Sequence, residues 1–314
     1  MQIPVLAVVG PTASGKTALA VEIAKNFNGE VVSADSMQIY KYLNIATAKP
    51  DEEEKSGVRH HLMDFLEPDE RFSVSQYKLL ADKAIEDIVS RKKTPVLAGG
   101  TGLYADTLLN GIELTDYEIS FDIRERLMKE AKEDGIEKLY DRLKNIDPQA
   151  AEKISINDTK RILRVLELYE ATGVTKTQQN ENSRLNPSPY KPLIIGLNAH
   201  DREILYNRIN IRVDKMLDMG LLEETKWFYQ NYSPDTAGQA IGYKELLPYL
   251  NGEKSLEDCV ENLKRATRRY AKRQLTWFRK NQDINWIYID GKSFEEIKTE
   301  AFEIINKSTV FTEE

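Results

Sequence analysis

The chain has 314 residues, of which 41% are hydrophobic and 30% charged, and its formal net charge is −7. This is the balance of a globular protein with a buried core, and it excludes a disordered or membrane-spanning chain. The apolar stretch at the N-terminus lacks the basic flank of a signal peptide, and the single cysteine, Cys259, excludes an internal disulfide. We therefore expect a cytoplasmic protein with no membrane partner.

Apolar runs alternate with helical periods over the first hundred residues. The sequence predicts strands at 3–9, 30–34 and 94–98. It predicts helices at 17–27, which Gly29 should end, and at 74–89. Strands that alternate with helices are typical of a parallel sheet covered by helices on both faces.

From about residue 116 the pattern changes to charged helices alone, at 121–134, 136–145 and 159–172, followed by a polar loop at 178–191. A strand at 192–197, a helix at 201–219 that Asp201 begins and Gly220 ends, and a strand at 284–289 restore the first pattern. We predict an α/β fold. Its P-loop-type parallel sheet core, residues 1–115 and 191–314, is interrupted by an all-helical inserted domain at 116–190.

A phosphate-binding motif lies between the first strand and the first helix. Its residues are Gly10, Pro11, Thr12, Ala13, Ser14, Gly15, Lys16 and Thr17, which fit G-x-x-x-x-G-K-[ST]. Backbone N–H groups of such a loop converge on phosphate oxygens, and the helix N-terminus adds a favourable dipole. Lys16 would neutralise phosphate charge, and the Thr17 hydroxyl would hold Mg²⁺, the cofactor we expect.

The motif predicts a bound di- or triphosphate but not the reaction. No N-K-x-D motif and no apolar strand ending in Asp-Glu occurs, so Asp35 is the best acidic candidate beside the phosphates. Ligands of open parallel sheets lie beyond the carboxyl ends of the strands, so Asp35 and Thr101 should face the loop. A helix cap for Asp35 and a turn residue for Thr101 are the alternatives. His60 and His61 are interpreted as structural.

A basic stretch near the C-terminus contrasts with the acidic whole. Residues 264–280 hold eight basic residues and no acid, which leaves −15 on the rest of the chain. On a helix, Arg265, Arg268, Arg269 and Lys272 would share one side, a pattern that suits backbone phosphates of a nucleic acid. Lys160 to Arg164 form a second basic helix segment. A solvated helix face is the alternative for both.

Seven ordered stretches carry a family resemblance. They are GPTASGKT at 10–17, SADSMQIYKYLNIATAKP at 33–50, HHLMDF at 60–65, AGGTGLY at 98–104, NDTKRILRVLELYEATG at 157–173, AGQAIGYKEL at 237–246 and TRRYAKRQLTWFR at 267–279. Together they resemble the tRNA dimethylallyltransferases, also called isopentenyl-diphosphate:tRNA transferases. Met37 stands where many members have arginine, and without cysteines for a zinc finger the chain resembles the bacterial form.

The resemblance implies transfer of a dimethylallyl group from dimethylallyl diphosphate to N6 of the adenine just 3′ of the anticodon. An adenine amine is a poor nucleophile and needs a base, for which Asp35 is the candidate, and Thr101 and Lys16 would stabilise the leaving diphosphate. The resemblance also favours Arg208 and Arg212, four residues apart on one helix face, as diphosphate ligands, although two solvated arginines remain the alternative.

The tRNA, bound through its anticodon stem-loop by a monomer, is the expected macromolecular partner. The residues expected to contact it are Asp35, Ser36, Met37, Gln38, Thr101, Thr159, Lys160, Arg161, Arg164, Gln239, Ile241, Gly242, Lys244, Arg268, Arg269, Lys272 and Arg273. Three other readings stay open: a small-molecule or nucleoside kinase, a prenyl transferase acting on free adenine nucleotides, and a nucleotide-dependent RNA-binding protein without chemistry.

Overall fold

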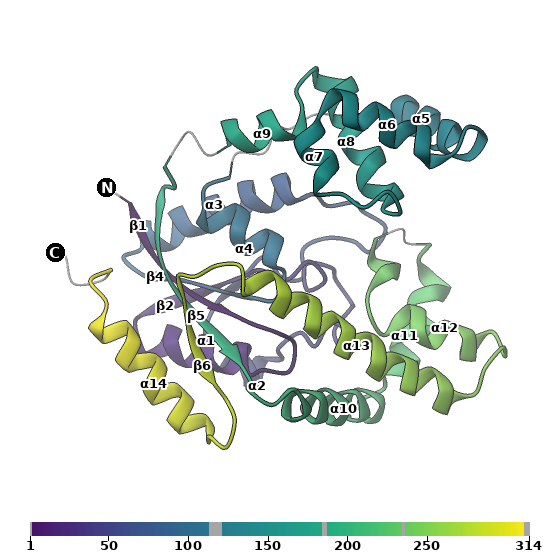
Figure 1. The fold of residues 1–314 in the computed structure, drawn as a ribbon. Helices are drawn as coiled ribbons and strands as arrows, with labels where there is room; N and C mark the ends of the chain where they lie inside the picture. Colours follow the sequence, from purple (N-terminus) through teal and green to yellow (C-terminus); the bar gives the residue numbers. More distant parts are fainter. Residues whose placement is uncertain (1, 113–120, 184–186, 234–235, 311–314) are drawn as a thin grey trace. The chain divides into compact units, whose positions relative to one another are not determined.

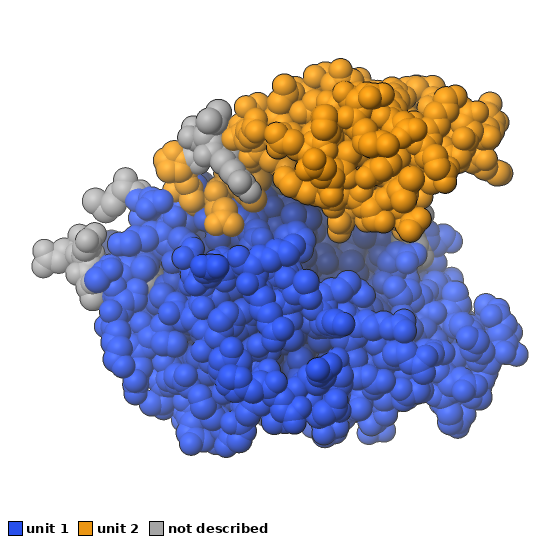
Figure 2. Space-filling view, viewed as in Figure 1, with its two compact units in different colours: residues 1–109, 189–314 blue, residues 110–188 orange. Residues whose placement is uncertain are grey.

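The computed structural model describes residues 2–112, 121–183, 187–233 and 236–310. The chain forms two compact units (Figure 2), unit 1 of residues 1–109 and 189–314, and unit 2 of residues 110–188. Each unit has its own hydrophobic core. In the part of the chain described, no helix is both long and apolar enough to cross a membrane.

Unit 1 is built on one six-stranded sheet. Its strands, in spatial order, are β3 (His60–His61), β2 (Gly29–Ser33), β4 (Thr94–Gly99), β1 (Ile3–Val9), β5 (Tyr190–Asn198) and β6 (Ile284–Tyr288). Neighbouring strands are parallel, with Val8 opposite Ala98 on one side and Ile195 on the other. The predicted parallel α/β core is therefore confirmed, and all its strands deliver their carboxyl ends to one edge.

Helices cover both faces of the sheet (Figure 1). Those of unit 1 are α1 (Lys16–Asn26), α2 (Glu52–Lys55), α3 (Val74–Ser90), α4 (Gly102–Leu109), α10 (Arg202–Asp218), α11 (Leu221–Asn231), the 3₁₀ turn Ala237–Gln239, α12 (Tyr243–Leu250), α13 (Leu256–Phe278) and α14 (Phe294–Lys307). Successive side chains of a strand point to opposite faces. Leu6 and Val8 of β1 accordingly join a core with α1, α10 and α14, whereas Val5 and Ala7 join one with α3 and α4.

A third apolar cluster lies beside the sheet within unit 1. Segment 39–43 packs there against α10, α11, α12 and α13, through Tyr40, Val213, Phe228 and Tyr243 among others. This cluster supports the loops that follow β2, and so it supports one wall of the site described below.

Unit 2 is helical, with α5 (Phe121–Glu133), α6 (Ile136–Ile146), α7 (Pro148–Glu152), α8 (Thr159–Thr172) and α9 (Lys176–Asn182). Leu127, Leu143 and Leu166 lie at the centre of its core. The loop expected at 178–191 is wrong in its first part, because Thr175 and Gln178 form a capping box that begins α9. It is also wrong at its end, where β5 begins at Tyr190.

The expected role of Gly29 is also wrong. The C-cap of α1 is Phe27, and Asn28 rather than glycine takes the left-handed conformation, with φ 48°. Gly29 instead opens β2, where a Cβ atom would lie 2.7 Å from the carbonyl oxygen of Thr94. The glycine allows β2 to approach its neighbour rather than ending the helix.

Candidate active site

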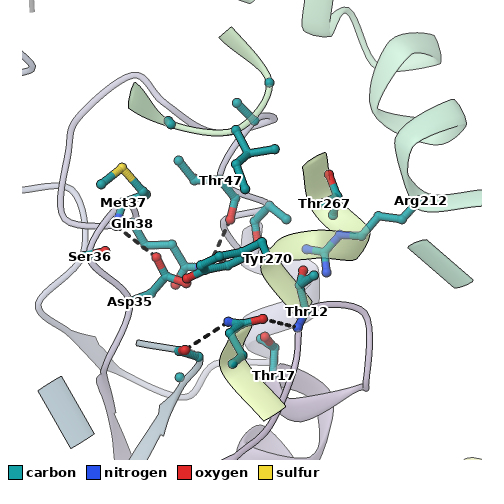
Figure 3. Close-up of a pocket in the computed structure, with 18 of the residues that line it drawn as sticks. Thr12, Thr17, Asp35, Ser36, Met37, Gln38, Thr47, Arg212, Thr267 and Tyr270 are labelled. Carbon is teal, nitrogen blue, oxygen red and sulfur yellow. Dashed lines mark hydrogen bonds between the residues drawn. The ribbon is translucent and has the colours of Figure 1, made fainter. Parts of the chain in front are cut away.

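A cavity of about 260 Å³ in unit 1 collects most of the residues singled out by the sequence (Figure 3). Its lining comes from the loops that follow β1, β2 and β4 and from helices α10 and α13. Its polar wall includes Thr12, Lys16, Thr17, Asp35, Gln38 and Arg212, and its apolar wall includes Val213, Met216, Leu221, Ile241 and Leu263. The cavity therefore offers an anionic group and an apolar group separate surroundings.

The Gly10–Thr17 loop is closed on itself. Ser14 Oγ donates to the Pro11 carbonyl at 2.9 Å, and Lys16 Nζ donates to the same oxygen at 2.6 Å. Gly10 has φ 142°, and a Cβ there would lie 2.5 Å from the Leu197 carbonyl oxygen, so only glycine fits. Thr12, Lys16 and Thr17 line the cavity, whereas Ser14 is buried beneath it.

Two half-buried cations, Lys16 and Arg212, line the cavity. Burial, and then the nearby Arg212, lower the pKa of Lys16 to about 7, and Asp35 partly offsets this. Burial also lowers the pKa of Arg212, opposed by Glu54 and Asp35. An anion in the cavity would favour both charged forms, so the wall is preorganised for one. Arg208, one turn earlier on α10, is exposed and is not part of the cavity lining.

Asp35 lies at the cavity wall two residues beyond the end of β2. Its Oδ1 accepts the Met37 N–H at 2.9 Å, which fixes the carboxylate, and Ser36, Met37 and Gln38 line the cavity beside it. Thr101 lies next to Ser36, whose N–H donates to Thr101 Oγ1 at 3.0 Å. The Thr101 side chain is not itself part of the cavity lining, so its predicted contact with the leaving oxygen stays a prediction.

A buried glutamine joins the loops that follow β1 and β4. Gln274 on α13 accepts the Thr12 N–H at 2.9 Å and donates to the Gly100 carbonyl at 2.9 Å (Figure 3). Gly100 leaves room for this bond, because a Cβ there would lie 2.1 Å from Gln274 Nε2. Gly99 and Gly102 likewise allow close approach, to Ala34 and Trp277. These glycines serve packing, and none has positive φ.

Tyr270 crosses the cavity between the phosphate loop and Asp35 (Figure 3). Burial, and then the charge of Asp35, raise the pKa of its hydroxyl well above the ordinary value. The side chains of Thr101 and Gln274 lie close enough to the hydroxyl to oppose this rise in its pKa. Tyr270 therefore stays a neutral phenol that presents a ring face and a hydrogen-bonding group to the cavity.

The remaining predicted tRNA contacts of unit 1 divide between cavity and surface. Gln239, Ile241, Gly242, Lys244 and Arg273 line the cavity. Arg269 and Lys272 are exposed on α13. Arg268 does not share their free surface, because it donates to Asn210 on α10 at 2.7 Å and pairs with Glu261. The predicted contacts of Arg268, Arg269 and Lys272 with tRNA stay predictions.

In unit 2, Thr159, Lys160, Arg161 and Arg164 lie on α8 and are exposed. Arg161 pairs with Asp158 at 3.3 Å, and Arg164 pairs with Glu167 at 3.0 Å. Their contact with tRNA stays a prediction.

His60 and His61 lie in different surroundings. His61 Nε2 lies 2.7 Å from the buried carboxylate of Glu30, which also binds Arg91 and Lys93, so His61 is part of a buried ionic cluster. His60 lines the cavity, its Nδ1 lies 2.9 Å from the Val58 carbonyl, and burial lowers its pKa.

The sequence assigned no role to Gln274, and it suggested for Tyr270 only an apolar or stacking surface beside the basic residues, not a place in the cavity. Both residues lie on α13, the helix that carries the basic stretch. The 3.6-residue period of a helix places them on the inner side of α13. A polar glutamine in the buried phase of an amphipathic helix was the available signal.

The chain matches a known family over most of its length. The IPP transferase family profile matches residues 38–281. The chain belongs to the IPP transferase family. A tRNA dimethylallyltransferase of Acetivibrio thermocellus is 54% identical over 288 residues, covering 91% of this chain and 92% of that protein. One of a Thermoanaerobacter species is 49% identical over 303 residues, covering 95% and 96%.

Solved IPP transferase family structures share the fold. The full-length tRNA isopentenylpyrophosphate transferase of Bacillus halodurans superposes with a TM-score of 0.73 at 41% identity, covering 98% of this chain and 96% of that one. A eukaryotic dimethylallyltransferase acting on tRNA superposes with a TM-score of 0.83 at 32% identity, covering 96% and 78%.

Proposed function

We propose that this protein transfers the dimethylallyl group of dimethylallyl diphosphate to N6 of the adenosine just 3′ of the tRNA anticodon. The observation that carries the proposal is that the phosphate loop and Asp35 line one cavity. Its relatives are named tRNA dimethylallyltransferases. In the reaction the bond from the allylic carbon to the diphosphate oxygen breaks, and a bond from that carbon to N6 forms.

The phosphate loop would hold the diphosphate, which departs with the electron pair of the broken C–O bond. Lys16 turns from the Pro11 carbonyl to the phosphate, and Arg212 meets it from α10. Each well-aimed donor contributes about 3 kcal/mol of transition-state stabilisation. Arg208 is a weaker candidate, because it is exposed away from the cavity lining.

The donor set fits Mg²⁺. Mg²⁺ prefers oxygen ligands, usually one or two from the protein together with phosphates and waters. The Thr17 hydroxyl follows Lys16 and lines the cavity, so it would hold the ion there. When bound, the ion neutralises charge on the diphosphate.

Asp35 would accept the proton that N6 loses as the new bond forms. Its Oδ1 is held by the Met37 N–H, which orients the carboxylate at the cavity wall. The purine must leave its stack in the anticodon loop to reach this place. The ring of Tyr270 and the apolar wall give the base and the prenyl group surfaces to pack against.

Unit 2 and the exposed basic residues of α13 would hold the tRNA outside the cavity, with the protein acting as a monomer in the cytoplasm. A small-molecule kinase would use the phosphate loop but would gain nothing from Arg269 and Lys272, which suit a phosphate backbone.

Incubation with radiolabelled dimethylallyl diphosphate, unmodified tRNA and Mg²⁺ tests the proposal. We expect label in tRNA, with no dependence on ATP. Consumption of ATP with a small acceptor, and no label in tRNA, would replace the proposal with a kinase.

A further inference from the structure

The loop of residues 44–48, called here the 44–48 loop, forms part of the cavity wall through Ala46, Thr47 and Ala48. A carboxylate on the far side of this loop holds it in place. Glu224 Oε2 accepts the N–H groups of Asn44 at 3.0 Å and Ile45 at 2.8 Å. Its Oε1 accepts the Ala46 N–H at 2.9 Å and the Tyr243 hydroxyl at 2.8 Å. Bonds to a charged acceptor are the stronger kind, so one side chain fixes three successive peptide groups.

The 44–48 loop in turn holds the side chain of Gln38. Gln38 Nε2 donates to the carbonyl oxygens of Thr47 and Ala48, each at 3.3 Å. Its Oε1 accepts the Ser33 hydroxyl at 3.3 Å. The opposite orientation of the amide would place its oxygen against two carbonyl oxygens, which repel it. The loop therefore fixes the orientation of the Gln38 amide.

In this orientation Gln38 offers a hydrogen-bond acceptor, its Oε1, to a ligand. Its Nε2 faces the two loop carbonyls, whereas Oε1 accepts the Ser33 hydroxyl and has a second lone pair to offer. Gln38 lines the same cavity as Asp35. An acceptor there matches the amine on C6 of adenine, which has two N–H groups, and repels the C6 oxygen of guanine or hypoxanthine.

We infer that Glu224 is a positioning residue for purine selection: it holds the 44–48 loop so that Gln38 presents only an acceptor to the exocyclic group of the base. One N–H of the adenine amine is then bound by Gln38 while the other faces Asp35. The inference rests on the proposed function, and it adds a residue that does not line the cavity.

The test measures the relative affinity of two anticodon stem-loops that differ only in adenine or hypoxanthine at the acceptor position. The wild type should prefer adenine by about tenfold, the discrimination typical of a well-placed base contact. Glu224→Gln replaces one carboxylate oxygen by an amide that cannot accept, and the preference should fall to about twofold. Affinity for dimethylallyl diphosphate, bound at the other end of the cavity, should stay within about twofold of the wild type.

Two further variants separate this role from general damage. Tyr243→Phe removes only one bond to Glu224 and should reduce the preference less than Glu224→Gln does. Glu223→Gln changes the neighbouring exposed carboxylate, which makes none of these bonds, and should leave the preference and the thermal stability unchanged.

A double-mutant cycle shows whether Glu224 acts through Gln38. In a Gln38→Ala background the part of the preference that Gln38 supplies should already be lost, and adding Glu224→Gln should reduce the preference no further. An unchanged preference in Glu224→Gln, or an additional loss in the double variant, would overturn the inference. A wild type that binds both stem-loops equally would overturn the inference alone, whereas one that binds neither would also overturn the proposed function.

Discussion

A carboxylate lies near each end of strand β2. Glu30 is the second residue of the strand, and Asp35 lies two residues beyond its last residue. Glu30 is buried and binds His61, Arg91 and Lys93. Arg91, more than burial, sets its pKa, which is held well below the ordinary value. Asp35 instead faces the cavity across from Lys16 and Arg212.

A buried ionic cluster does not by itself mark a reactive site. At the amino end of the strand the charges satisfy one another and hold the sheet edge. At the carboxyl end, burial lowers the pKa of Lys16 and of Arg212 more than the neighbouring carboxylates raise it. A bound anion would therefore stabilise the charged forms of both side chains.

Asp35→Asn should have the largest effect on chemistry. Removing the proton acceptor should lower the rate of prenyl transfer about 10³-fold, the usual range for a general base. Affinity for tRNA should change no more than a few-fold, and the unfolding temperature should stay within a degree or two. Steady-state kinetics of prenyl transfer measure the rate, and thermal denaturation measures the unfolding temperature. An Asp35→Asn variant with full turnover would show that Asp35 is not the base.

Lys16→Met should lower kcat/KM for dimethylallyl diphosphate about 10²-fold, because one preorganised donor to the leaving group is lost. Arg208→Met, which removes an exposed cation outside the cavity lining, is the matched control and should change kcat/KM little. Equal losses in the two variants would show that Arg208 also contacts the diphosphate.

Glu30→Gln should reverse the pattern of Asp35→Asn. It should cost about 3 kcal/mol in the free energy of unfolding, because Arg91, Lys93 and His61 lose the buried carboxylate that they share, and kcat should be unchanged. Since folding lowers the Glu30 pKa from 4.5, its stabilisation is present above that pH and is lost as pH falls further. Urea denaturation at pH 7 and pH 3 should show a smaller pH dependence for Glu30→Gln. A variant as stable as the wild type at pH 7 would contradict this account.

Diphosphate binding should take up a proton above neutral pH. The Lys16 pKa is about 7 in the free protein, and a bound anion raises it, so binding at pH 8 must protonate the amine. Affinity for inorganic diphosphate should therefore fall as pH rises from 7 to 9, by up to about tenfold per pH unit. Calorimetry in buffers of different ionisation enthalpy should detect the proton at pH 8, and identical heats in all buffers would contradict the prediction.

The smallest effect should come from the exposed residues of α13, outside both ends of β2. Arg269→Ala with Lys272→Ala should weaken tRNA binding several-fold and reduce the slope of log affinity against log salt by about 1 to 2. The rate of transfer from the bound complex should be unchanged. A slope equal to that of the wild type would remove these residues from the interface.

The sheet and the phosphate loop could be predicted because their signals are local. An apolar run such as residues 3–9 and the fixed spacing of Gly10, Lys16 and Thr17 need no tertiary information. The roles of Gln274 and Gly100 could not, because their contact joins residues 174 apart in the chain. Arg208 and Arg212 share a helix face in sequence, but one turn of about 5.4 Å decides which reaches the cavity.

The short elements were missed for a related reason. The two-residue strand β3 and helix α2 lack the length in which periodicity can be read, and their positions follow from pairing with β2 and from the capping box of Asp51 and Glu54. Likewise, nothing local shows that Glu224 holds the 44–48 loop.

The most direct test of the central claim is analysis of the nucleosides of tRNA after reaction with dimethylallyl diphosphate and this protein. If the phosphate loop and Asp35 act on two substrates across one cavity, the wild type should yield N6-dimethylallyl adenosine next to the anticodon, and Asp35→Asn should yield almost none. Label at another nucleoside, or equal product from the two proteins, would contradict the account.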